Sequence, residues 1–259
     1  MTELQTKQEE LLTLLRNPAS GNPLVFENGV MLDPHTGETF DFRDGIPVIL
    51  RPDDVFGWNR KQQRGYNLFS PLYDVLYKFK LAHKWLAEIA DIMEVESGEY
   101  VLETSVGTGQ QIRDMKRRGI TAHFFGNDLS FGMLRRCQKN MKRWEIDMGL
   151  VQGNAESLPF QDTLFDVVFH VGGFNFFNDK RAAITEMIRV AKPGAKLYIA
   201  DETDTIRDRP GLLARIADRW MPRREAFVTP IDLIPKDMLH VETHTLLKDK
   251  FWLVAFRKP

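Results

Sequence analysis

The sequence predicts an α/β fold built on a mostly parallel, doubly wound sheet. From residue 100 onward, short apolar runs alternate with amphipathic helical segments, which is the pattern of consecutive βαβ units. A loop of small residues follows the first of these runs, where open α/β sheets bind their ligands. The chain closes with two apolar runs only three residues apart, too close for a crossover, so these strands must pair antiparallel. With 259 residues, the chain has room for one large domain and a small appendage.

Three segments precede the alternating part of the chain. Residues 3–16 carry leucines near helical spacing, so we expect a helix. Residues 17–52 hold short apolar stretches separated by proline and glycine, a pattern that predicts a small β-hairpin or β-meander. Residues 56–95 carry apolar side chains at spacings of three and four, and Ser70-Pro71 is expected to separate two helices there.

The alternating part supplies the strands of the predicted sheet. Five apolar runs are candidates for parallel strands with helices between them, and two more form the terminal hairpin. These runs are 100–103, 121–127, 148–152, 165–170, 195–200, 241–247 and 251–257. We therefore expect seven strands. We divide the chain into an N-terminal helix with a small β module at 1–55, a helical cap at 56–98 and a core at 99–259.

The composition excludes several classes of protein. Lys and Arg number 35 against 36 Asp and Glu, and this net charge of −1 argues against a protein that mainly coats nucleic acid or an anionic membrane. The one cysteine, Cys137, excludes an intrachain disulfide and any zinc site with two or more thiolates. No apolar run approaches the roughly 20 residues of a membrane span, and the polar N-terminus is not typical of a secretory signal. We therefore expect a soluble, cytoplasmic protein.

A loop with small residues at spacing two follows the first parallel strand. Glu103 ends that strand, and Gly107 and Gly109 allow the backbone to approach a ligand and to turn into the next helix. Asp128 ends the second strand roughly 20 residues further on, where nucleotide-binding α/β folds place an acid for ribose hydroxyls. The alternative role for Asp128 is a helix N-cap, for which Ser130 is the better candidate.

Five motifs follow one another within residues 66–257. They are Val101–Gly109, Gly126–Leu134, Gly153–Phe160, Phe165–Val168 and Glu186–Ala195. In order and spacing they resemble the motifs of class I S-adenosylmethionine-dependent methyltransferases, and within these the UbiE-like group that acts on small molecules. The resemblance implies a Rossmann-like sheet, S-adenosylmethionine as cofactor and S-adenosylhomocysteine as product.

The resemblance also implies a set of cofactor contacts. Glu103 would lie near the amino-acid end of the cofactor, Asp128 would bind the ribose hydroxyls, and His170 would lie beside the reactive methyl group. Leu129 and Met133 would pack on the adenine. The full set is Tyr66, Tyr73, Glu103, Ser105, Gly107, Gly109, Asp128, Leu129, Met133, Asn154, Ala155, Glu156, His170 and Val171.

Four of these positions match the family less closely or less specifically. Ser105 stands where the family usually has glycine, and Asn154 stands where an acid usually contacts the adenine edge. The amide oxygen of Asn154 still accepts a hydrogen bond from the adenine amino group, so neither change removes cofactor binding. Tyr66 and Tyr73 lie where relatives often have a Tyr-Asp pair near the cofactor, but these rings can equally pack the cap on the sheet.

The stretch Gly37–Leu50 ends a segment, residues 23–50, that resembles the Trm112-like zinc-ribbon module found free or fused ahead of some methyltransferases. That module often binds zinc through cysteines. This segment has no cysteine, and His35 alone does not hold zinc. We therefore expect a metal-free module that is held by the apolar packing of Phe26, Phe40, Phe42 and Ile49.

Catalysis of methyl transfer depends mainly on positioning, and a base is needed only when the acceptor retains a proton. His170 ends the fourth parallel strand and is the candidate base; the alternative is that it only lines the pocket. The following Gly172–Phe177 lacks the Asn/Asp-Pro-Pro-Tyr motif of amino-directed enzymes. Its aromatic rings, with Trp220 and Phe227, favour an apolar or planar acceptor, although core packing explains such residues equally well.

The leading prediction is methyl transfer to an oxygen or carbon of a small apolar or aromatic metabolite, by a monomer or homodimer without a nucleic-acid partner. An RNA methyltransferase is an alternative, suggested by the Trm112-like module and by the cations within Arg135–Arg143. A methyltransferase-like regulator without turnover is another, and a third is an enzyme that uses the bound sulfonium for other chemistry, such as cyclisation. We interpret Asp201–Asp204 as a polar pocket edge and expect no metal.

Overall fold

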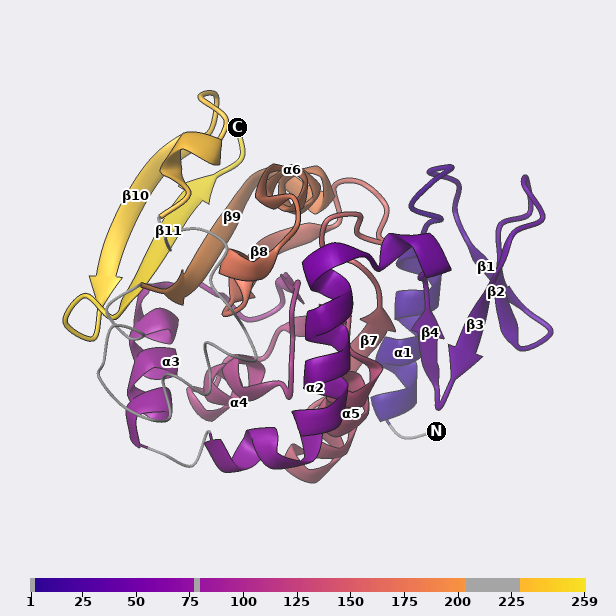
Figure 1. The fold of residues 1–259 in the computed structure, drawn as a ribbon, viewed down its shortest axis with the longest axis horizontal. Coiled ribbons are helices and arrows are strands. Elements are labelled where there is room, and N and C mark those ends of the chain that lie inside the picture. Colours follow the sequence, from indigo (N-terminus) through magenta and orange to yellow (C-terminus); the bar gives the residue numbers. More distant parts are fainter. Residues whose placement is uncertain (1–2, 77–79, 204–228) are drawn as a thin grey trace.

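The computed structural model describes residues 3–76, 80–203 and 229–259 (Figure 1). The strands in these ranges form one eleven-stranded sheet in the order β1-β2-β3-β4-β7-β6-β5-β8-β9-β11-β10. The central strands β7, β6, β5, β8 and β9 run parallel, and β11 pairs antiparallel with both β9 and β10. The expected mixed α/β sheet with a terminal antiparallel hairpin is therefore confirmed. The core strands are β5 (Tyr100–Glu103), β6 (His123–Asp128), β7 (Met148–Gln152), β8 (Phe165–Val171), β9 (Ala191–Glu202), β10 (Leu239–Leu246) and β11 (Phe251–Arg257).

The predicted count of seven strands is wrong for this sheet, because the N-terminal strands join it. They form an antiparallel meander whose last strand pairs in parallel with β7 through Val48 and Gln152. The amide of Ile49 also donates to the carbonyl oxygen of Gln152 at 2.8 Å. These contacts are made by the backbone, which every sequence carries, so residue patterns did not reveal them. The N-terminal elements are α1 (Glu3–Leu14), β1 (Val25–Glu27), β2 (Val30–Leu32), β3 (Thr39–Arg43) and β4 (Ile46–Val48).

A buried carboxylate, rather than aromatic packing alone, holds the N-terminal module together. Asp33 is fully buried, and its side chain accepts hydrogen bonds from three neighbouring side chains and two backbone amides. Phe40 and Ile49 are buried as expected. Phe26, however, is 46% exposed, and its ring contacts Phe42 at a centroid distance of 4.7 Å. Phe26 therefore lies on the surface of the module and not in its core.

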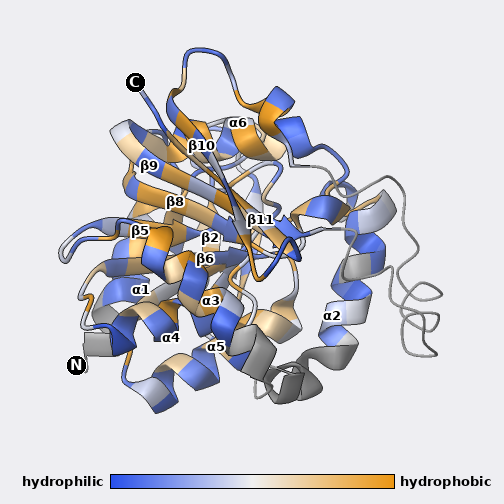
Figure 2. Cartoon of the chain, turned by 90° about the vertical axis from the view of Figure 1, so that its left-hand side faces the viewer, coloured by the Kyte–Doolittle hydropathy of each residue, from blue (hydrophilic) through white to orange (hydrophobic). Residues whose placement is uncertain are grey.

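Two apolar clusters lie on opposite faces of the sheet, and central strands such as β8 and β9 are largely apolar (Figure 2). Successive residues of one strand point to opposite faces, so Leu102 joins one cluster and Val101 the other. The first face carries α1 and α6, and the second carries α3, α4 and α5. The helices that follow α1 are α2 (Gly57–Leu76), α3 (Lys80–Ile92), α4 (Gln110–Arg117), α5 (Phe131–Trp144) and α6 (Lys180–Val190), with short 3₁₀ turns at η1 (Pro52–Asp54), η2 (Phe174–Phe176) and η4 (Ile231–Leu233).

The expected break between the two cap helices at Ser70-Pro71 is wrong. Helix α2 continues through this pair to Leu76, and α3 begins at Lys80. Figure 1 shows the ribbon of α2 turning along its length. A proline inside a helix removes one backbone hydrogen bond and bends the helix, and it does not always end it.

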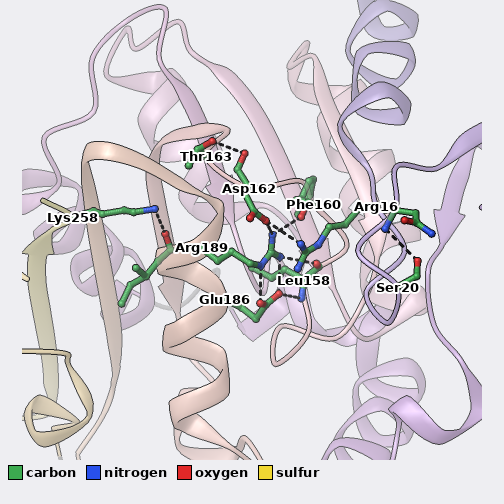
Figure 3. Close-up of polar contacts among 11 residues, drawn as sticks. Arg16, Ser20, Leu158, Phe160, Asp162, Thr163, Glu186, Arg189 and Lys258 are labelled. Carbon is green, nitrogen blue, oxygen red and sulfur yellow. Dashed lines mark hydrogen bonds and ion pairs between the residues drawn. The ribbon is translucent and has the colours of Figure 1, made fainter.

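An ion-pair cluster joins the N-terminal segment to the core (Figure 3). Arg189 of α6 donates to both carboxylate oxygens of Glu186 and to Asp162, each at 2.7 Å, and Arg16 donates to the same Asp162 oxygen at 3.0 Å. Glu186 in turn accepts from the amide of Leu158 at 2.7 Å. The cluster therefore fixes the loop between β7 and β8 against both α6 and the end of α1.

Candidate functional site

The structure brings most of the expected site residues to one edge of the sheet, where the parallel strands end. Glu103 and Asp128 are the last residues of the neighbouring strands β5 and β6. The segment 154–156 follows β7, and His170 and Val171 end β8. Parallel strands point the same way, so the loops that follow them gather at this edge although they are far apart in the sequence.

The loop after β5 adopts the glycine-dependent turn that its sequence predicts. Gly107 and Gly109 have φ values of 53° and 80°. A Cβ atom at Gly109 would clash with the flexible end of Met141 and lie 3.0 Å from Sγ of Cys137, both in α5, and other residues rarely adopt its positive φ, so this position favours glycine. Among the described residues, no atom outside the immediate chain neighbours lies within 4 Å of the place where a side chain at Gly107 would begin, so the loop borders space that they leave open. Ser105, between Thr104 and the turn, is half-buried.

Asp128 connects this loop to the start of α5. One carboxylate oxygen accepts from the amide of Gly107, and the other accepts from the amide of Ser130, both at 2.8 Å. Ser130, as expected, is the N-cap of α5, since its hydroxyl accepts from the amide of Met133 at 3.2 Å. Burial raises the pKa of Asp128 to about 6, against the lowering effect of backbone hydrogen bonds from Ser130, Gly107 and Leu129.

Glu103 is a second buried carboxyl group at the same edge. Its side chain is almost fully buried, and its Oε2 atom has no hydrogen-bond partner among the described residues. Burial, together with the nearby charge of Asp128, raises the pKa of Glu103 well above its usual value. A buried acceptor without a partner is costly, so this position favours a ligand that donates hydrogen bonds or carries positive charge.

The segment after β7 is held by hydrogen bonds within the chain. The side-chain oxygen of Asn154 accepts from the amide of Glu156 at 3.0 Å, and its nitrogen donates to the carbonyl oxygen of Asp54 at 3.2 Å. Glu156 accepts from Asn59 at 3.0 Å and from the amide of Asn178 at 2.7 Å. Glu156 therefore joins α2 to the loop after β8, a structural role that its sequence motif did not indicate. Ala155, which lies between Asn154 and Glu156 in the sequence, is buried.

His170 is fully buried at the end of β8. Its Nδ1 atom lies 3.1 Å from the hydroxyl of Thr104, and its Nε2 atom has no hydrogen-bond partner in the described part of the chain. The rings of Phe174 and Phe177 pack edge-on against the imidazole at centroid distances of 5.6 and 5.0 Å. Burial lowers the pKa of His170 to about 3, so the ring is neutral at pH 7 and is a weak proton acceptor.

Asp201 at the end of β9 positions the loop that follows His170. Its carboxylate accepts from the amides of Asn175, Glu202 and Gly173 at 2.7, 2.8 and 3.3 Å. Burial and the neighbouring charge of Glu202 raise the pKa of Asp201 to about 7. Within the described ranges, no three His, Cys, Asp or Glu side chains gather as a possible metal site.

The structure describes the side chain of one of the two residues expected from the cap. Tyr66 lies on α2 and is half-buried, whereas the side chain of Tyr73 lies outside the described residues, as do Trp220 and Phe227. Leu129 is half-buried and Met133 is buried in the first turn of α5.

None of the helices in the described ranges is long and apolar enough to cross a membrane.

Three amide side chains on α2 also reach this edge, and they were not identified as site residues from the sequence. Asn59 donates to Glu156, and Gln63 donates to the carbonyl oxygen of Leu129, both at 3.0 Å. The Asn67 side-chain oxygen accepts from the Ser130 hydroxyl and from the amide of Gly132, at 2.7 and 2.8 Å. Their spacing of four residues was visible in the sequence, but polar residues at that spacing usually form a solvated helix face.

Comparisons with known proteins agree with this architecture. Residues 102–199 match the family described as "Methyltransferase domain". The demethylmenaquinone methyltransferase of Listeria welshimeri is 34% identical over 149 residues, which are 54% of this chain and 63% of that protein. The match therefore spans less than two thirds of the relative's length.

Solved structures share the fold at low sequence identity. Haemonchus contortus phosphoethanolamine N-methyltransferase 2, in complex with S-adenosyl-L-methionine, aligns with a TM-score of 0.61 at 14% identity, over 82% of this chain and 62% of that chain. The [4+2]-cyclase SpnF aligns with a TM-score of 0.59 at 13% identity, over 76% and 95%. These two proteins have different activities, so the shared fold alone does not decide the reaction. The similarity of residues 23–50 to a Trm112-like module and the domain boundaries stay predictions.

Proposed function

We propose that this chain transfers a methyl group from S-adenosylmethionine to an oxygen or carbon of a small apolar or aromatic molecule. The match of residues 102–199 to the methyltransferase-domain family and the 34% identity to a demethylmenaquinone methyltransferase over 149 residues support this proposal. The observation that carries the proposal is the pair of buried carboxyl groups, Glu103 and Asp128, at the ends of neighbouring strands beside the open turn at Gly107.

The residues at this edge fit the cofactor chemically. The ribose of the cofactor brings two vicinal hydroxyl donors, and a carboxylate with four acceptor positions, such as Asp128, has room for them beside its two backbone bonds. The amino-acid end brings an ammonium group. It donates to the Glu103 oxygen that has no partner among the described residues, and it stabilises the ionised form of Glu103 that burial disfavours. The open space at Gly107 leaves room for the ligand to approach the backbone.

When bound, S-adenosylmethionine supplies an electrophilic methyl group on a sulfonium centre. The residues of the chain then bind the cofactor, orient the methyl acceptor and exclude water from the site. Asp128 and Glu103 hold the two ends of the cofactor, and the half-buried ring of Phe177 beside His170 gives the acceptor side an apolar wall. Holding the acceptor in line with the sulfur–methyl bond contributes much of the rate acceleration, because a fixed geometry replaces a bimolecular encounter.

His170 lines the acceptor side in this proposal and is not a strong general base. A base works best when its pKa is near the working pH, and burial holds the pKa of His170 at about 3. Its buried Nε2 atom has no hydrogen-bond partner among the described residues, so it offers an acceptor to a hydroxyl or amide donor of the methyl acceptor. His170 therefore orients an acceptor that reaches the site already deprotonated or is itself strongly nucleophilic.

Calorimetric titration with S-adenosylmethionine and S-adenosylhomocysteine tests the first half of the proposal. We expect one cofactor per chain, and the absence of both binding heat and a thermal shift at millimolar cofactor contradicts it. A screen of small aromatic acceptors for release of S-adenosylhomocysteine tests the second half. The named substrate of the relatives makes quinols a natural starting set.

Two outcomes of the same experiments favour the alternatives. Strongly salt-dependent tRNA or rRNA binding together with methylated RNA favours an RNA methyltransferase. Tight cofactor binding without transfer to any acceptor favours a regulator or a non-methylating enzyme.

A further inference from the structure

Helix α2 presents a row of amide side chains to the sheet edge that carries the site. Asn59, Gln63 and Asn67 are four residues apart, and residues at this spacing lie above one another on one helix face. The row contacts two different loops. Gln63 and Asn67 bond the segment after β6, and Asn59 bonds Glu156 in the segment after β7.

The bonds from α2 complete the hydrogen bonding of the segment after β6. The carbonyl oxygen of Leu129 accepts from Gln63 at 3.0 Å and from Gln152 at 2.8 Å, so both of its acceptor positions are used. At the start of α5, the Ser130 hydroxyl accepts from Met133 and donates to Asn67. The conformation of this segment therefore depends on α2 as well as on its own N-cap.

Asn67 acts as a second cap of α5 that comes from another helix. The first amides of a helix lack partners within it. Ser130 satisfies one of them, at Met133, and Asn67 satisfies another, at Gly132, at 2.8 Å. If α2 moves away, Gly132 loses this partner and Leu129 loses one of its two donors. Opening of the helix therefore loosens the segment that directly follows Asp128.

We propose that Asn59, Gln63 and Asn67 latch α2 across the cofactor-binding loops, position those loops for the adenosine of the cofactor, and limit the rate at which cofactor is exchanged. This inference rests on the proposed function, because it assigns the segments 128–133 and 154–156 to the adenosine end. The three residues are positioning residues. They act through the loops, and the chemical step does not depend on them.

The test uses the full chain, S-adenosylhomocysteine as probe and a matched set of variants. Gln63→Met keeps the length of the side chain and removes its hydrogen-bond donor. Gln63→Lys restores a donor at the same position. Arg64→Gln, at an exposed neighbouring position of the same helix, is the control. The measurements are the dissociation rate of S-adenosylhomocysteine by stopped flow and the amide hydrogen exchange of residues 129–133 in the ligand-free protein.

We expect Gln63→Met to speed dissociation about threefold to tenfold, the effect of one hydrogen bond of net strength near 1 kcal/mol, and to speed exchange at 129–133. Gln63→Lys should recover most of both effects, and Arg64→Gln should change neither. The rate of methyl transfer in a single turnover at saturating cofactor should stay near that of the wild type, which separates positioning of the loops from chemistry.

Two results overturn the latch. The first is an unchanged dissociation rate in Gln63→Met, whether or not hydrogen exchange at 129–133 becomes faster. The second is an equally fast dissociation in Gln63→Lys, which makes the effect one of side-chain shape and not of the hydrogen bond. In each case the wild type still binds the probe, so the proposed function stands. A wild type that binds neither S-adenosylmethionine nor S-adenosylhomocysteine overturns both together.

Discussion

Two regions of the molecule bury carboxylates, and they treat them in opposite ways. In the N-terminal module, burial alone would raise the pKa of Asp33, but hydrogen bonds from Ser20, Asn17, Thr36 and His35 lower it well below its usual range. At the edge of the sheet, burial raises the pKa of Asp128 to about 6 and that of Glu103 well above its usual value.

The difference follows from the number of donors that the chain itself supplies. Asp33 accepts from three side chains as well as from two amides, so its charge is compensated before any ligand binds. Among the described residues, the donors to Asp128 are backbone amides, and one oxygen of Glu103 has no partner there. A compensated carboxylate stabilises a fold, whereas an uncompensated one is available to a ligand at a cost in stability.

The largest effect expected from this comparison is on cofactor binding. Asp128→Asn should weaken binding of S-adenosylhomocysteine about 100-fold, because the ribose hydroxyls lose a charged acceptor whose hydrogen bonds are each worth about 1.5–3 kcal/mol. Calorimetry measures the affinity, and circular dichroism confirms that the variant is folded. A folded variant with wild-type affinity contradicts the assignment of Asp128.

The matching change in the other region should act on stability instead. Asp33→Asn removes the charge that several donors share, so the melting temperature should fall, while the affinity of the remaining folded protein should stay within a few-fold of the wild type. Thermal unfolding and calorimetry on the same preparation measure both. Should a folded Asp33→Asn lose affinity as strongly as Asp128→Asn, the separation of the two regions is wrong.

A smaller effect is expected from the pH dependence of stability. The folded-state pKa of Asp201, about 7, lies above its ordinary value, so protonation favours the folded state and stability from this group rises as the pH falls through 7. Between pH 8 and pH 6, the wild type should gain about 1 kcal/mol relative to Asp201→Asn. The opposite contribution of His170, whose pKa is lowered, is present in both proteins and cancels. Chemical unfolding of both proteins at the two pH values measures their free energies of unfolding. The same change with pH in the wild type and in Asp201→Asn contradicts this prediction.

The smallest effect is expected for His170→Gln. A general base contributes about 10²–10⁴-fold to a rate, whereas a residue that orients the acceptor contributes less. We expect a loss of under about tenfold in the single-turnover rate, with a pH profile that keeps its shape between pH 6 and 8. If the pH–rate profile of His170→Gln lacks a titration step that the wild type shows, and the rate falls much further than tenfold, His170 is the general base after all.

Much of the core was predictable because local patterns report it directly. The alternation of apolar runs and amphipathic segments after residue 100 predicted the parallel strands, and three residues between the last two runs required an antiparallel hairpin. The positive φ of Gly107 and Gly109 was predictable as well, since few other residues adopt it without strain. Glu103 and Asp128 were each predicted to end a strand, and they meet in the structure because parallel strands end at one edge of the sheet.

The role of α2 was not predictable, because it depends on which loops the helix reaches. Asn59 and Gln63 look like solvent-facing residues until the fold places Glu156 and the carbonyl oxygen of Leu129 beside them. The same holds for Asp33, whose donors come from positions 11 to 16 residues away and from its own turn.

By itself, the sequence determined the order of strands and helices along the core, the glycine turn and the acids that end two neighbouring strands, because these depend on side-chain period and on φ. Only the tertiary structure decided that the N-terminal strands extend the sheet through the backbone of Gln152, and which buried carboxylates are compensated. Backbone pairing and hydrogen-bond compensation are made between distant segments, so the chemistry of one segment does not specify them.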